Sequence, residues 1–94
     1  MKMANVYVIK DVVADVICAG PFIAVNDGVM IRSIMELLNN ERNPQSAPYR
    51  SNPSDYELWS VGSMDDKTGV LIPLKSSVMM HRLSALYTPI SNDK

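Results

Sequence analysis

The sequence predicts a small α+β domain: an antiparallel β-sheet of three to five strands with one amphipathic helix packed on one face. Short β-branched and aromatic runs, separated by turn residues, are typical of strands. One stretch, residues 27–40, carries apolar residues at helical spacing instead. The length of 94 residues allows a single domain, so residues 1–94 are expected to share one core.

Two strands are expected near the start of the chain. Residues 6–9 are β-branched and aromatic, and the segment from Val12 through Cys18 is expected to pair with them, with Asp15 at or near the turn. Gly20-Pro21 interrupts the pattern, and residues 22–25 follow as a short extended segment.

The strongest periodic signal predicts a helix from about Asp27 to Asn40. Asn26 or Asp27 can accept a hydrogen bond from an amide group of the first turn. The asparagines at the end of this segment and Pro44 after it are typical of a helix stop. The apolar stripe consists of Ile31, Ile34, Met35 and Leu38, widened by Met30 and Leu37.

Residues 41–55 form the longest stretch without periodicity, and their three prolines and small polar residues predict a loop of extended character. Residues 56–61 alternate as a strand does. The segment 65–69 predicts a hairpin turn into a second strand at 70–72, with Gly69 supplying a positive φ.

The C-terminal part of the chain gives a weaker pattern. Residues 78–87 have the spacing of a short helix, and a closing strand is the alternative. Residues 88–94 are expected to be a frayed tail.

Composition limits the possible functions. Nine basic and ten acidic residues give a net charge of −1, without the basic stripe on which duplex-binding proteins depend. Cys18 is the one cysteine, which fits a reducing compartment. No segment contains the run of about 18 apolar residues that a membrane-spanning helix needs. These features favour a soluble cytosolic protein with no membrane association.

Catalysis is not expected. His81 has no acidic neighbour in the sequence, and Cys18 lies in an apolar stretch where a buried, inert thiol is usual. The turn at 65–69 lacks the alternating oxygen ligands and closing glutamate of a calcium loop. We therefore expect no enzyme, no cofactor and no metal.

Two blocks of the sequence resemble a known family. Residues 21–27 carry Pro-Phe and then Asn-Asp at the start of a helix that contains Arg32; residues 52–69 carry Pro-Ser-Asp-Tyr-Glu-Leu, a glycine and an Asp-rich turn ending in Thr-Gly. Their order and spacing resemble the small non-structural protein of gokushovirus-type microviruses, which are single-stranded-DNA phages. The likeness covers roughly residues 5–72. It implies an accessory protein in the cytoplasm of the bacterial host, with a part in single-stranded DNA synthesis or DNA binding.

Five residues are candidates for contacts with single-stranded DNA, since exposed rings stack on bases and basic groups meet phosphates. They are Arg32, Arg42, Tyr49, Arg50 and Trp59. For Trp59 and Tyr56, packing in the core or in a dimer interface is the alternative, whereas Tyr7 and Phe22 are expected in the core. Clustering of the basic residues on one face would support DNA binding, and their scattering over the surface would count against it. The residues to compare are Arg32, Arg42, Arg50, Lys75 and Arg82.

Two functional hypotheses follow. In the first, the protein is a replication accessory protein that binds single-stranded DNA through the 41–55 loop and the helix arginine. In the second, it is a protein-interaction module that binds a viral or host protein and no DNA. A homodimer is expected in either case, because sheet edges and seven methionines leave apolar surface that so small a chain cannot cover.

Overall fold

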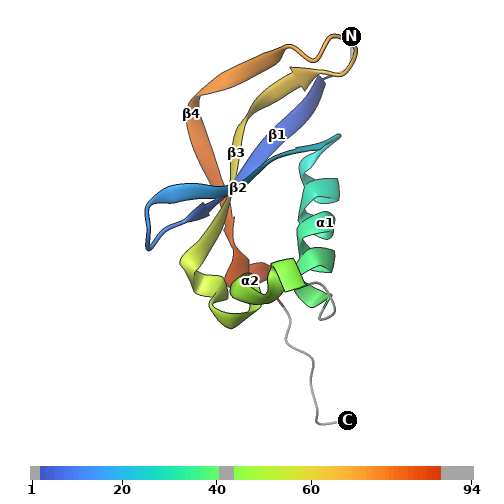
Figure 1. Ribbon diagram of the computed structural model, residues 1–94. Helices are drawn as coiled ribbons and strands as arrows, with labels where there is room; N and C mark the ends of the chain where they lie inside the picture. The colour runs from blue at the N-terminus through green and yellow to red at the C-terminus, as the bar shows by residue number, and fades with distance from the viewer. Residues whose placement is uncertain (1–2, 41–43, 88–94) are drawn as a thin grey trace.

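A computed structural model describes residues 3–40 and 44–87, and it has the predicted α+β fold (Figure 1). Four antiparallel strands lie in the order β2-β1-β3-β4, so β1 and β3 are central and β2 and β4 are the edges. None of the described helices has the length and apolar character needed to cross a membrane. In chain order the elements are β1 (Met3–Asp11), β2 (Val16–Ala24), α1 (Asp27–Asn39), a 3-10 turn (Pro44–Ser46), α2 (Ala47–Ser51), a 3-10 turn (Pro53–Asp55), β3 (Tyr56–Asp65), β4 (Leu71–Arg82) and α3 (Leu83–Leu86).

The β1–β2 hairpin turns at the predicted place. The Asp11 carboxylate accepts hydrogen bonds from the amides of Val13 and Ala14, both at 3.0 Å, and Asp15 has a φ of 60°. Asp tolerates this left-handed conformation better than a branched residue would. The pairing partner of β1 begins only at Val16 and includes residues 22–24, so the two predicted extended segments are one continuous strand.

Helix α1 confirms the prediction of a helix beginning at Asp27. The side chain of Asn26 accepts a hydrogen bond from the Val29 amide at 2.9 Å, which satisfies one free donor of the first turn. The buried stripe is Met30, Ile34 and Leu38, and the predicted stripe member Met35 lies outside it, 38% exposed. The three buried residues are four apart, so the face that meets the sheet is centred on them rather than on Met35.

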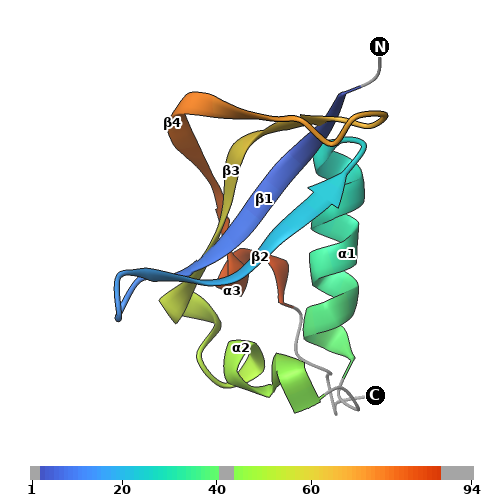
Figure 2. The same cartoon turned by 45° about the horizontal axis from the view of Figure 1, so that its top comes forward.

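The core lies between α1 and one face of the sheet (Figure 2). Tyr7, Ile9 and Leu58 contribute from the two central strands and have no exposed surface. Leu83 and Leu86 of α3 close the end of this layer. The prediction that Tyr7 is a core residue is confirmed, and Phe22 packs against the same cluster while staying half-buried.

Residues 44–55 differ from the predicted extended loop, because they form two 3-10 turns and the short helix α2. Pro44, Pro48 and Pro53 each lie in a first turn, where the missing amide hydrogen has no helical partner in any case. The prolines therefore start helical turns here instead of preventing them. Residues 41–43 lie outside the described residues.

The C-terminal segment combines both alternatives that the sequence left open. Strand β4 runs from Leu71 through Arg82, much further than the predicted 70–72, and only Leu83–Leu86 is helical. The turn before β4 is the predicted one: the Asp65 carboxylate accepts from the amides of Lys67 and Thr68, and Gly69 has a φ of 77°. The tail at 88–94 lies outside the described residues.

Candidate functional site

The sheet has a second face, opposite the core, which we call the open face. Successive residues of a strand point to opposite sides. The core therefore takes Tyr7 and Ile9 from β1, whereas Val6, Val8 and Lys10 point the other way. The helical side chains of the core cluster all lie on the Tyr7 side. By this alternation and the strand register, the open face comprises Val6, Val8, Lys10, Ile17, Ile23, Glu57, Trp59, Val61, Met79 and Arg82.

Trp59 occupies the middle of the open face and is held by two neighbours. Its indole nitrogen donates a hydrogen bond to Glu57 Oε1 at 3.0 Å, and Lys10 Nζ lies 5.4 Å from the ring centroid. Such a cation–π contact contributes about 0.5–1 kcal/mol at an exposed site. The half-buried ring is therefore oriented within the chain itself before anything binds to it.

A row of charges runs across one end of this face. Lys10, Glu57 and Arg82 are paired in register on three adjacent strands. Arg82 donates to Glu57 Oε2 at 3.3 Å, and Lys10 Nζ lies 3.0 Å from Asp15 Oδ1. The Glu57 side chain, almost fully buried, thus has a hydrogen-bond donor for each of its oxygens. Each charge at this end of the face has a partner of opposite sign.

A hollow of about 260 Å³ opens beside Trp59. Its walls are mainly apolar, and its polar lining residues are Lys10 and Asp15 from the β1–β2 hairpin and Ser77 from β4. An apolar or aromatic group suits such a lining. The lining residues are Val8, Lys10, Asp15, Val16, Ile17, Trp59, Val61 and Ser77.

The structure does not gather the four described DNA-contact candidates at one place. Arg32 is exposed on α1, Tyr49 and Arg50 lie on α2, and Trp59 is on the open face of β3. Arg42 lies outside the described residues. Arg50 Nη1 donates hydrogen bonds to the Asn40 carbonyl at 3.0 Å and to the Ser46 hydroxyl, so its guanidinium serves the local structure.

The two tyrosines near α2 are packing residues. The rings of Tyr49 and Tyr56 meet edge to face, with centroids 4.8 Å apart and planes at 82°. Both are partly buried against the core cluster. For Tyr56 this supports packing rather than stacking on a base. Trp59, in contrast, is not part of that cluster.

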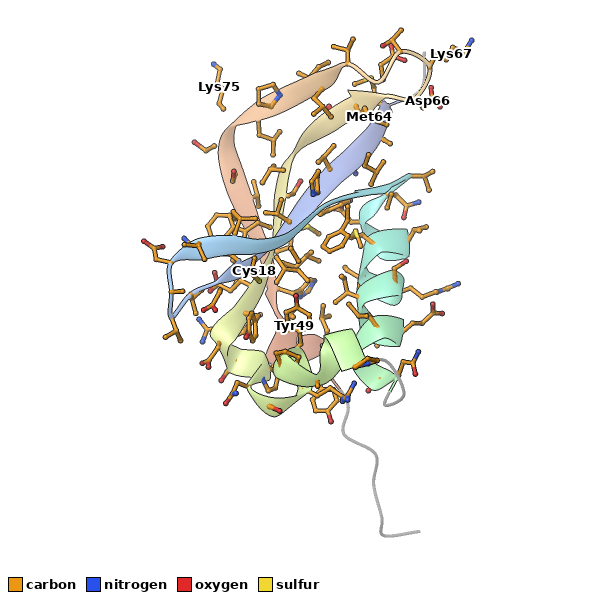
Figure 3. The ribbon with its side chains drawn as sticks, in the orientation of Figure 1. Cys18, Tyr49, Met64, Asp66, Lys67 and Lys75 are labelled. Carbon is orange, nitrogen blue, oxygen red and sulfur yellow. The ribbon has the colours of Figure 1, made fainter. Side chains whose placement is uncertain are left out.

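The remaining basic residues are also scattered. Figure 3 shows Lys75 at the outer bend of β4, at the opposite end of the molecule from Tyr49 on α2. Arg82, at the other end of β4, is bound to Glu57. The described basic residues of the comparison set therefore come from three elements and face different directions, the arrangement that counts against DNA binding.

Cys18 is exposed, which differs from the expected buried thiol. It lies on β2, an edge strand of the sheet that the described residues form. Burial, followed by the neighbouring Cys18 thiol, raises the pKa of Tyr49 to about 12. Burial also raises the pKa of Tyr7 to about 12, and the hydrogen bond that the Tyr7 hydroxyl donates to Asp27 adds to this effect.

We expect the protein to lose stability as the pH rises from 10 to 12. In the folded state the pKa of Tyr7 and the pKa of Tyr49 are both higher than the ordinary value of 10. Between pH 10 and pH 12 the native state therefore binds more protons than the unfolded state. The stabilisation is complete below pH 10 and is lost as the pH passes 12. Urea unfolding across this range checks it. Tyr7→Phe should weaken the pH dependence, and an unchanged slope in that variant would contradict the assignment to Tyr7.

The fold and the open face together define a small α+β protein in which the described helices cover one side of the sheet. A model of the Phage ORF5 protein family matches residues 4–86, which is more than four-fifths of the chain. The chain therefore belongs to the Phage ORF5 protein family. No curated protein matches it significantly, and neither does any solved structure. The expectation of a phage protein is confirmed at this level, and the match continues past residue 72, where the resemblance seen in the sequence ended.

Proposed function

We propose that this phage protein is a non-enzymatic accessory protein that works by binding a viral or host protein in the cytoplasm of the infected bacterium. The observation that carries this proposal is the apolar surface along β4. Nine successive residues, Leu71–Met79, are exposed. Extended apolar surface on a small protein is typical of a protein-binding site. Five of the nine are large hydrophobic residues: Leu71, Ile72, Leu74, Val78 and Met79.

The charge distribution supports a protein partner over a nucleic acid. Phosphate contacts supply most of the affinity of DNA-binding proteins and need clustered basic groups. Here the net charge is −1, and two of the described basic groups, Lys10 and Arg82, are paired with carboxylates. A protein partner that buries apolar side chains has no such requirement.

The finer assignment to gokushovirus-type microviruses rests on the two sequence blocks at 21–32 and 52–69. Both blocks lie within the matched residues of the phage family. In the structure they form the end of β2, the cap and first part of α1, the turn before β3, and β3 with the hairpin turn that follows it. Their residues have structural roles there, as the Asn26 cap and the Asp65 turn illustrate.

Site-specific photo-crosslinking tests the proposal. A photoreactive residue in place of Leu74, on the exposed β4 segment, should give an adduct with another protein in cells infected by the phage. The same residue in place of Ser54, exposed in the turn before β3, is the matched control and should not. An adduct at position 74 that nuclease removes, or equal adducts at both positions, would contradict the proposal.

Single-stranded DNA binding is the second candidate, and the Trp59–Lys10 pair favours it. A half-buried indole with an ammonium group 5.4 Å from its centre combines the aromatic and basic groups that single-strand binders use. Fluorescence anisotropy of a labelled oligonucleotide at low and moderate salt distinguishes the candidates. Steeply salt-dependent binding that falls in Trp59→Ala and in Lys10→Ala would establish DNA binding. No binding at tens of micromolar protein in low salt would eliminate it.

A further inference from the structure

We propose that a second copy of this chain docks on the open face, sheet against sheet, with Trp59 in the interior of the interface. The inference rests on the proposed function, because it assigns part of the same apolar surface to a defined partner. It also gives the expected homodimer a specific geometry.

The open face has the composition of an inner sheet face. In two-layered β-proteins, sheets stack about 10 Å apart, and apolar side chains from both inner faces interdigitate. Val6 and Val8 of this face are already buried, although neither belongs to the core cluster. Around them Ile17 is 55% exposed, Ile23 49% and Met79 39%. A second sheet would cover these three side chains.

The alternative route to a dimer, continuation of the sheet through an edge strand, is obstructed at both edges. Pro21 lies within β2 and Pro73 within β4, and proline has no amide hydrogen to donate to a new strand. Strand β4 also carries Lys75, and its pairing with β3 shifts register between Ser60 and Gly62. Proline, lysine and bulges are the devices that keep edge strands from pairing. The open face presents apolar side chains on all four strands and remains available for the second copy.

The charges of the open face are compatible with a copy of itself. In a two-fold dimer the same patch meets itself, so a patch of one sign would repel its partner. Here Lys10 pairs with Asp15 and Arg82 with Glu57, and the two pairs sum to zero charge. They lie at one end of the face and would form its polar rim.

Trp59 meets the requirements of an interface residue. Tryptophan is enriched among the residues that dominate binding energy. Its indole N–H already donates to Glu57, so burial in the interface would leave no unsatisfied donor. The hollow of about 260 Å³ beside it is open to receive an apolar side chain of the second copy.

Sedimentation equilibrium of the purified full chain, combined with tryptophan fluorescence, tests the proposal. Trp59 is the only tryptophan, so its emission reports on this face alone. We expect the wild type to sediment as a dimer at tens of micromolar. Dilution should shift the emission to longer wavelength as Trp59 meets water.

Ile17→Lys, on the open face, should raise the dimer dissociation constant at least tenfold. Val29→Lys, at a residue that is 44% exposed on α1, is the matched control and should dimerise as the wild type does. Met79→Lys, across the face on β4, is a second variant if Ile17→Lys does not fold. A monomeric wild type, or a dimer unaffected by both open-face substitutions, would overturn the proposal. If crosslinking at Leu74 persists in a monomeric protein, only the dimer fails and the proposed function stands.

Discussion

Replacing Leu58 with alanine is expected to lower the free energy of unfolding by about 2–5 kcal/mol. Leu58 lies on the central strand β3 and has no exposed surface. It belongs to the cluster that joins the sheet to α1 and α3. Truncation removes buried methyl groups and leaves a cavity that the two well-paired neighbouring strands cannot close. Since domains of this size are stabilised by about 5–15 kcal/mol, the loss is a large fraction of the total.

Urea unfolding at one fixed protein concentration measures this effect. Val13→Ala is the matched control, because Val13 is 75% exposed in the turn after β1 and should change stability by less than about 0.5 kcal/mol. If the two variants unfold at the same urea concentration, the layer between sheet and helix is not the core of this protein.

The second large effect is expected for Gly62→Ala. A Cβ atom at Gly62 would lie 2.5 Å from the Ile72 carbonyl oxygen, a backbone atom of the adjacent strand that has no rotamer to change. The pairing of Gly62 with Pro73 would have to open. We expect a loss of about 1–3 kcal/mol, the range found for overpacked sites.

Gly28→Ala provides the control for this substitution and should raise the free energy of unfolding instead of lowering it. Gly28 lies in the first turn of α1, and the nearest atom to an added Cβ is 3.4 Å away. Alanine is more favourable than glycine in a helix by about 0.5–1 kcal/mol. Urea midpoints of both variants, measured side by side, check the pair. A neutral Gly62→Ala variant would contradict the close approach of β3 and β4.

The open-face and core predictions are tested by different measurements, so a negative result for one leaves the other standing. The substitutions at Leu58 and Gly62 test the folding of one chain. The substitutions at Ile17 and Val29 test the association of folded chains. Association makes apparent stability depend on concentration, so stability comparisons need a single protein concentration. A dimeric wild type should unfold at higher urea concentration as the protein concentration rises, and Ile17→Lys should lose that dependence.

Features that depend on neighbouring residues could be predicted from the sequence. The start of α1 at Asp27 follows from the Asn26 cap and the apolar spacing after it. The hairpin turn at 65–69 follows from one carboxylate that can accept nearby amides and a glycine that allows a positive φ. Each of these involves residues at most four positions apart, so the sequence pattern contains the whole interaction.

Other local features were misjudged because two principles compete there. Proline is unfavourable in the interior of a helix but favourable in its first turn. In residues 44–55, all three prolines lie in a first turn. An apolar residue at helical spacing can lie on either border of the stripe, and Met35 lies outside. The C-terminal limit of β4 depends on pairing with β3, which the spacing of residues 78–87 does not reveal.

The candidate site was predicted only in part, since Trp59 was identified and its surroundings were not. Lys10 stands beside Trp59 because the register of β1 and β3 pairs Val8 with Trp59 and Lys10 with Glu57. The alternation of β1 places Lys10 on the same side as Val8, but the sequence contains no signal for which strand lies opposite.

Local chemistry thus accounts for the helix cap, the turns and the strands themselves, because backbone preference and short-range hydrogen bonds act within a few residues. Strand order, register and the side of the sheet that α1 covers were decided by tertiary packing. Only when the helix has buried Tyr7, Ile9 and Leu58 on one side does the other side, with Trp59, become the surface left for a partner.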